Sequence, residues 1–170
     1  MKKLIIAIAA CMTFGMADAQ DRRQMGGIYH AYPYASKADN LVDDIPEGYT
    51  PFYLSHYGRH GSRWMTNDER YEWLYSYFAD RKNLTPLGRK VEKAMRKVLD
   101  NARGNGGRLS RLGAIQHEGI ARRMYSRLPQ IFAPGNRVKA RASVVDRCVK
   151  SMQAFTAMMQ SLQPALEMDI

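Results

Sequence analysis

The sequence is poor in cysteine and in acidic residues, and it holds few long apolar runs. Its 170 residues include 2 cysteines, 26 lysines and arginines, and 16 aspartates and glutamates, which gives a formal net charge of +10. So few cysteines exclude a scaffold held together by disulfides, and stability must come from packing. The basic excess favours an anionic partner such as nucleic acid, a membrane surface or a polyphosphorylated small molecule. Charge alone does not choose among these partners.

An apolar run stands at the start of the chain. Two lysines precede it, it covers about residues 4–14, and the small-residue sequence Ala17-Asp18-Ala19 follows. This order is typical of a secretory signal peptide, and the run is too short to span a membrane. We therefore predict a signal peptide over residues 1–19, export to the periplasm or the extracellular space, and no membrane span.

Cleavage after Ala19 changes both the charge and the cysteine count. It removes two lysines and one aspartate, so the net charge falls from +10 to +9. It also removes Cys11, which leaves Cys148 without an intrachain partner. A small buried residue in a helix is the favoured role of Cys148, against a reactive thiol. A lipoprotein anchored at Cys11 is the alternative, because Ile8-Ala9-Ala10-Cys11 resembles a lipidation site.

The exported part divides into a lead-in and a domain. Residues 20–48 are polar and show no sustained period, which predicts an extended segment. Residues 49–170 are expected to form part of one domain. Its first element is predicted to be a buried strand over residues 50–57, which are rich in aromatic side chains and end at Gly58.

Two helices are predicted next. Residues 67–78 carry many large apolar side chains, which indicates a helical segment packed on the core. A longer helix should begin at Thr85-Pro86, a good N-cap followed by a proline at the first helical position, and end before Gly104. Its inward face is predicted to consist of Leu87, Val91, Met95, Val98 and Leu99.

The second half is predicted to continue with a helix, a strand and a helix. Ser110 is the expected cap of a helix that ends near Arg127, and residues 136–142 alternate enough for a short strand. Ser143 or Asp146 would cap a last helix that ends near residue 162. Its inward residues should be Val149, Met152, Phe155, Thr156 and Met159. This order of elements predicts an α/β fold with a layered sheet and flanking helices.

The residues with the clearest chemistry are Arg59-His60-Gly61-Ser62-Arg63, directly after the predicted first strand. Ligands gather at the carboxyl ends of strands in open α/β sheets. A neutral imidazole can attack phosphorus, and the covalent intermediate divides one difficult displacement into two. Arg59 and Arg63 would place two forked, permanently charged donors beside the nucleophile His60.

Arg141 offers a third cation of this kind. It stands where the predicted strand 136–142 gives way to a helix, and strand-to-helix junctions suit anions. Arg141 is therefore predicted to complete a phosphate pocket with Arg59 and Arg63.

These motifs resemble the histidine acid phosphatases of the histidine phosphatase superfamily. The signature R-H-G-x-R is matched by residues 59–63, the helix start L-T/S-x-x-G by residues 109–113, and R-A-S-x-x-x-R by residues 141–147. The chain looks most like the multiple inositol polyphosphate phosphatase and phytase-like branch. The resemblance implies a histidine phosphatase fold with part of a helical cap, His60 as the phosphorylated nucleophile, and phosphate binding by Arg59, Arg63 and Arg141. It implies phosphorylated small molecules such as inositol phosphates as substrates, with no metal or other cofactor.

The resemblance covers about residues 45–165, the N-terminal half of the family. Family members carry a second histidine followed by Asp or by Ala-Glu, which supplies the general acid, and this sequence has no such motif. A fragment or a truncated protein is therefore expected.

Several residues have plainer interpretations. His56 and His60 share the spacing of metal ligands on a helix, but they fall in a predicted strand and turn. His117 with Glu118 is expected to be structural rather than an acid-base pair, and the cluster Arg122, Arg123 and Arg127 a solvated face or an extra contact to a phosphorylated substrate.

A non-catalytic basic module that binds polyanions is the alternative function. The scattered arginines do not favour it, and an exported chain seldom meets nucleic acid.

Overall fold

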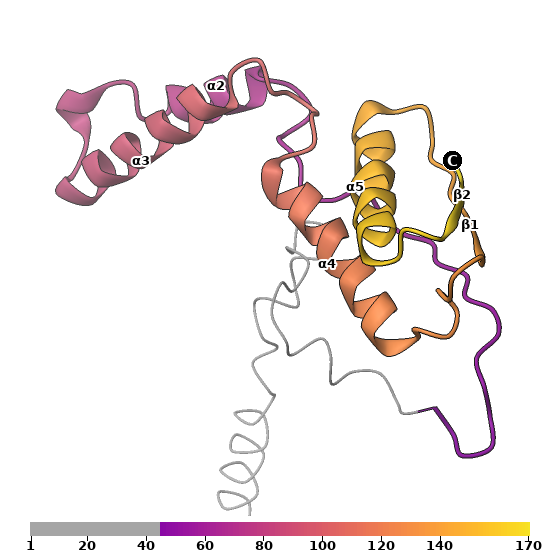
Figure 1. Cartoon of the computed structure of the whole chain (residues 1–170). Helices are drawn as coiled ribbons and strands as arrows, with labels where there is room; N and C mark the ends of the chain where they lie inside the picture. The colour runs from indigo at the N-terminus through magenta and orange to yellow at the C-terminus, as the bar shows by residue number, and fades with distance from the viewer. Residues whose placement is uncertain (1–44) are drawn as a thin grey trace, which may run out of the picture. The chain divides into compact units, whose positions relative to one another are not determined.

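The computed structural model describes residues 45–170, all in one compact unit, and they form a mixed α/β structure that is mostly helical (Figure 1). The predicted signal peptide, and the lead-in up to residue 44, lie outside the described residues. In chain order the elements are α2 (Glu69–Ser76), the 3-10 helix η3 (Arg81–Asn83), α3 (Pro86–Ala102), α4 (Arg111–Arg127), β1 (Arg137–Lys139), α5 (Asp146–Leu162) and β2 (Glu167–Asp169).

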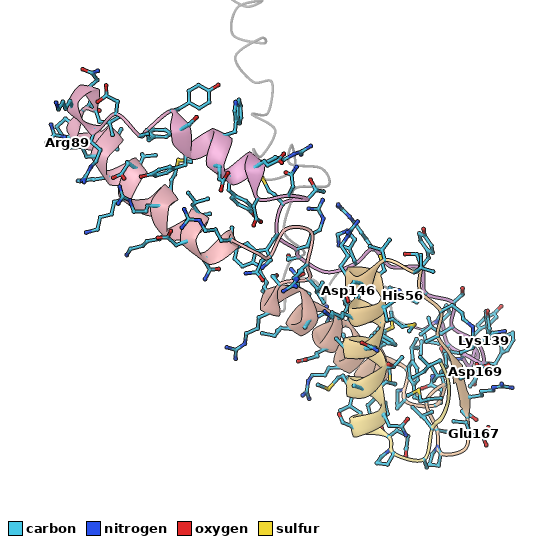
Figure 2. The ribbon with its side chains drawn as sticks, turned by 90° about the horizontal axis from the view of Figure 1, so that it is seen from above. His56, Arg89, Lys139, Asp146, Glu167 and Asp169 are labelled. Carbon is cyan, nitrogen blue, oxygen red and sulfur yellow. The ribbon has the colours of Figure 1, made fainter. Side chains whose placement is uncertain are left out.

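Strands β1 and β2 form a two-stranded parallel sheet, and α5 makes the connection between them. Arg137 pairs with Glu167 and Lys139 with Asp169, and three of these residues are labelled along the strand pair in Figure 2. A parallel pair needs a crossover of this kind, since a tight hairpin can join only antiparallel strands. The predicted strand at 136–142 is thus confirmed by β1, whereas the three-residue β2 was not predicted.

The core lies between α4, α5 and the segments that lead into the strands. Ala121 of α4 and Met159 of α5 are fully buried, and Phe132 and Leu166 complete the buried cluster. The predicted inward face of α5 is confirmed, because all five of its residues are buried or half-buried. Cys148 is also half-buried on α5 and takes part in no disulfide within the described residues.

Two helix starts follow the predicted capping. The Thr85 hydroxyl accepts a hydrogen bond from Gly88 N at the start of α3, and the Ser110 hydroxyl accepts one from Gly113 N at the start of α4. A side-chain oxygen in this position satisfies one of the free N–H groups of the first turn. Both N-cap predictions are therefore confirmed.

The predicted inward face of α3 is confirmed in part, because Leu99 is buried and Val91 and Met95 are half-buried. Leu87 is 71% exposed and Val98 is 49% exposed, whereas Glu92 is buried. The Glu92 carboxylate accepts hydrogen bonds from Tyr75 of α2 and from Arg96, which explains why a charged residue can be buried there. The apolar pattern therefore located part of this face and missed Glu92, a partnered carboxylate that joins α3 to α2.

The predicted strand over residues 50–57 is wrong. These residues are assigned to no strand, and Phe52 and Tyr57 are 94% and 100% exposed. A strand is defined by hydrogen bonds to a neighbouring strand, and this segment has none in the described part of the chain. Only Leu54 packs against the core cluster.

The start of α5 also differs from the prediction. Its N-cap position is Val145, which offers no side-chain acceptor, and Asp146 is the first helical residue. Asp146 instead pairs with Lys150 one turn later at 3.0 Å. None of the helices within residues 45–170 is long and apolar enough to cross a lipid bilayer.

Candidate functional site

Residues 59–63, called the motif turn below, lie against the first turns of α4. Ser62 O accepts hydrogen bonds from Ser110 N at 2.9 Å and from Ser110 Oγ at 2.8 Å, and Ser62 N donates to Gln116 Oε1 at 2.8 Å. His117 Nε2 donates to Arg59 O at 3.1 Å. One face of α4 thus holds the backbone at both ends of the motif turn.

Helix α5 holds the middle of the same turn. Gly61 N donates to Ser151 Oγ at 3.0 Å, and Ser151 Oγ donates to Arg147 O at 2.7 Å. Ser151 is buried, so its hydroxyl replaces the water that would otherwise satisfy Gly61 N. The motif turn is therefore bound to α4 and α5 together.

Two glycines permit this close approach. A Cβ added at Gly61 would overlap the backbone of Gly113 in α4, and a Cβ added at Gly113 would overlap the backbone of Ser62. The helix start L-S-R-L-G, residues 109–113, therefore supports the motif turn in two ways. Ser110 provides hydrogen bonds to the turn, and Gly113 provides the space beside it.

A short antiparallel pairing extends the contact past the turn. Arg63 and Leu109 form an isolated bridge, Trp64 N donates to Arg108 O at 3.1 Å, and Gly107 N donates to Met65 O at 2.7 Å. The glycine-rich turn before α4 is thereby held beside the motif turn.

His60 is half-buried, and its ring has a defined hydrogen bond. Nδ1 lies 2.8 Å from Gly61 O, and because a carbonyl oxygen can only accept, Nδ1 carries the hydrogen. In the neutral ring the lone pair is then on Nε2. His60 therefore has the tautomer that a nucleophilic Nε2 requires.

The predicted phosphate-binding arginines differ in their surroundings. Arg63 donates from Nη1 to Trp64 O at 2.7 Å, and its Nε is buried with no hydrogen-bond partner among the described residues. The Arg59 side chain is exposed, while its carbonyl oxygen is the acceptor for His117. Both arginines belong to the motif turn that α4 and α5 hold.

Arg141 lies in the irregular segment between Lys139, where β1 ends, and Asp146, where α5 begins, and a carboxylate occupies its guanidinium. Its Nη2 donates to Asp169 Oδ1 at 2.6 Å and its Nη1 donates to Asp169 O at 2.8 Å. The hydrogen bond from Arg141 is the main cause that lowers the pKa of Asp169 below its usual value. Arg141 is thus bound to the end of β2 and has no contact with the motif turn that the structure records.

Arg147 is a site residue that sequence reasoning did not select, although it ends the matched R-A-S-x-x-x-R stretch. Its Nε is buried without a partner in the described part of the chain, and Nη1 makes only a long hydrogen bond of 3.5 Å to Gly107 O. Its position one helical turn before Ser151 places it on the face of α5 that holds Gly61. The signal in the sequence was that Arg147 precedes Ser151 by four positions, which places both on one helix face. That spacing indicates a site residue only when Ser151 is known to contact the motif turn.

An open pocket of about 560 Å³ lies beside this region and is called the basic pocket below. Gly106, Gly107 and Arg108 line it from the glycine-rich turn, and Asp146, Arg147 and Lys150 line it from the first turn of α5. Arginine and lysine side chains on two elements thus face one cavity.

The remaining histidines have structural contacts. Burial is the main cause that lowers the pKa of His117, the hydrogen bond to Arg59 O raises it, and the positive charges of His56 and His60 lower it. The His117 ring is buried, which agrees with its expected structural role.

His56 lies beside α5 (Figure 2) and stacks on Phe155 with 6.0 Å between ring centroids. Within residues 45–170, no three His, Cys, Asp or Glu side chains come together as metal ligands.

Comparison with models of known protein families finds no family that matches this chain, and comparison with curated proteins finds no match either.

Proposed function

We propose that this chain provides the nucleophile and the phosphate-binding residues of an exported phosphomonoester hydrolase, with inositol polyphosphates as substrates. The observation that carries the proposal is the hydrogen bond from His60 Nδ1 to Gly61 O, which leaves the Nε2 lone pair for attack. The motif match of residues 59–63 supports it, as do the Nε atoms of Arg63 and Arg147, which have no hydrogen-bond partner within residues 45–170.

In the proposed step, His60 Nε2 forms a bond to phosphorus while the ester P–O bond breaks. The leaving group departs with the bonding electron pair as an alkoxide and takes a proton from solvent water. A second water then attacks phosphorus and gives up a proton to solvent, the N–P electron pair returns to Nε2, and inorganic phosphate is released. Arg59, Arg63 and Arg147 neutralise the phosphate oxygens and stabilise the charge in the transition state. Arg141 was predicted to join them, and it can do so only if it exchanges Asp169 for phosphate.

Rigid placement of the nucleophile is part of the proposal. Hydrogen bonds from Ser110 and His117, and to Ser151 and Gln116, fix the backbone on both sides of His60. A fixed nucleophile removes part of the entropy cost of reaching the transition state. The phosphohistidine step is therefore the half of the reaction that we assign to these residues.

The test is covalent labelling of the full chain by p-nitrophenyl phosphate. p-Nitrophenolate leaves without a proton, so this substrate probes His60 independently of any general acid. We expect an acid-labile phosphoryl group on His60, located by mass spectrometry of peptides prepared at alkaline pH, and no label in His60→Ala. His56→Ala is the matched control, four residues away, and should keep the label. A folded parent chain without label on His60 would refute the proposal.

The outcome also separates the alternative function. A non-catalytic module would bind polyanions with a steep salt dependence, would carry no label, and would be indifferent to His60→Ala. Export is proposed on the sequence of residues 1–19 alone, and the N-terminal sequence of the exported protein would test it, with Gln20 as the expected first residue.

A further inference from the structure

The basic pocket has the size and the charge of a site for a small anion. Its volume of about 560 Å³ falls within the usual range for small-molecule sites. Arg108, Arg147 and Lys150 bring three positive charges to it, and Asp146 brings one negative charge. The Asp146 to Lys150 ion pair is 3.0 Å long and more than half exposed on both sides, so it is weak and can open to an anion.

Hydrogen-bond donors in this pocket lack acceptors. The buried Nε of Arg147 has no partner among the described residues, and its Nη1 contact with Gly107 O is at the limit of hydrogen-bond length at 3.5 Å. The Arg147 guanidinium therefore has no good acceptor among the described residues, and an anion with several oxygens in the pocket can accept from its Nη atoms. The donors therefore favour phosphate over a neutral ligand.

The pocket adjoins the motif turn through two direct connections. Gly107 and Arg108 pair with Met65 and Trp64, immediately after the motif turn. On the other wall, Arg147 O accepts the hydrogen bond of the Ser151 hydroxyl, which in turn holds Gly61 N. A ligand in the pocket and a phosphate at His60 would thus contact the same connected backbone.

We propose that the basic pocket binds a second phosphate group of a polyphosphorylated substrate, and that Arg108 and Lys150 select polyphosphates over monophosphates. The inference rests on the proposed function for the phosphate at His60. The preferred substrate is then a compact molecule with two or more phosphates, because the two sites lie against the same segments of the chain. Arg108 and Lys150 act as specificity-determining residues, and the transfer step itself does not require them.

The experiment measures phytate binding to the full chain by calorimetry at low ionic strength, in a His60→Ala background that prevents turnover. The pocket variant is Arg108→Ser with Lys150→Ser. The control variant is Lys93→Ser with Lys97→Ser, which removes the same charge from exposed positions on α3. We expect the Kd for phytate to rise about tenfold or more in the pocket variant, and to change by less than about twofold in the control. Binding of inorganic phosphate, the second probe, should be affected much less than binding of phytate.

Asp146→Asn gives a second measurement, in which the affinity for phytate should rise instead of fall. It removes the negative charge from the pocket, so the Kd for phytate should fall several-fold. An increase in affinity cannot come from misfolding. Equal Kd values in the pocket variant and its control, or weaker binding in Asp146→Asn, would overturn the inference. So would a parent chain that does not bind phytate.

Failure of the proposed function is distinguishable from failure of this inference. If p-nitrophenyl phosphate labels His60 and the pocket variant binds phytate like its control, the hydrolase proposal stands and the second phosphate site is wrong. If His60 takes no label but phytate binding depends on Arg108 and Lys150, the hydrolase is wrong and the inference falls as stated, leaving a polyanion site in the pocket.

Discussion

Gly61 and Gly113 meet backbone to backbone, and neither position has room for a side chain. This contact joins the motif turn to the first turn of α4. It explains why two short motifs separated in the sequence have to occur together in this fold.

Replacing Gly113 by alanine should therefore destabilise the fold. We expect a loss of about 1–3 kcal/mol in the free energy of unfolding, because the new methyl group overlaps the backbone of Ser62. The control is Gly119→Ala in the same helix, where the added Cβ meets only the end of the Arg123 side chain at 3.2 Å. That variant should be neutral or up to about 1 kcal/mol more stable. Urea unfolding of both variants measures the difference, and equal effects would contradict the contact.

Ser110 should contribute more stability than Thr85, although both cap helices. Thr85→Ala removes only the cap of α3 and should cost about 1 kcal/mol. Ser110→Ala removes the cap of α4 and also the hydrogen bond from Ser110 Oγ to Ser62 O, which adds about 1 kcal/mol. Thermal unfolding of the two variants side by side would show the difference. A Thr85 effect as large as that of Ser110 would speak against a second role for Ser110.

Ser151→Ala should leave Gly61 N buried without an acceptor. The expected cost is about 1–3 kcal/mol, measured by urea unfolding. Ser126→Ala, at an exposed position of α4, should stay within about 0.5 kcal/mol of the parent. In the proposed hydrolase, Ser151→Ala should also slow labelling of His60 at a protein concentration and temperature where the variant is fully folded.

Stability should fall as the pH drops through about 6.5, because burial lowers the pKa of His117 from its usual 6.5 in the folded state. The unfolded chain then binds a proton at a higher pH than the folded chain does, so acid favours unfolding until the pH reaches the folded pKa. His117→Gln can still donate to Arg59 O but does not titrate. Between the lowered folded pKa of His117 and pH 6.5, the unfolding midpoint of this variant should depend less on pH than that of the parent. An equal pH dependence in the two proteins would contradict the role given to His117.

Carboxylates act in a different and lower pH range. A hydrogen bond from Tyr75 is the main cause that lowers the pKa of Glu92 from 4.5, and one from Arg141 lowers that of Asp169 from 3.8. Each ionised carboxylate stabilises the fold at pH values above its usual pKa. This stabilisation is lost as the pH falls through its lower folded pKa. We therefore expect the unfolding midpoint to fall in two separate pH ranges, one below 6.5 from His117 and one below about 4.5 from the two carboxylates.

Arg147→Ala should affect the proposed reaction more than Arg141→Ala. Arg147 carries a buried donor with no partner in the described part of the chain, and its loss should slow labelling of His60 by about a hundredfold. The guanidinium of Arg141 is already held by Asp169, so its loss should slow labelling by about tenfold or less. Initial labelling rates with p-nitrophenyl phosphate measure both. A stronger effect of Arg141→Ala would restore the assignment made from the sequence.

The helices were predictable because their signals are local. Thr85 with Pro86, and Ser110 with Gly113, lie within four residues of the helix starts that they determine. The strand predicted over 50–57 failed because a strand depends on a distant partner. Strand β2 has only three residues, too few to show alternation.

For the candidate site, the residue types could be chosen from the sequence, whereas the contacts that hold them could not. His60 and its neighbouring arginines are identified by residue type and spacing. Their supports Gln116 and Ser151 are separated from the turn by 54 and 90 positions, so no local pattern indicates them. Arg147 became a candidate only when the structure placed α5 against the turn.

These long separations have a kinetic consequence. The hydrogen bonds of Gly61 N and Ser62 N form only after α4 and α5 have docked, so the motif turn is assembled late in folding. Their amide hydrogens should exchange with solvent only when that docking opens, while amides in the first turns of α2 exchange by local fraying. His60, held in this way, should be ordered whenever the core around it is closed, and should lose its geometry in the same event that unfolds the domain.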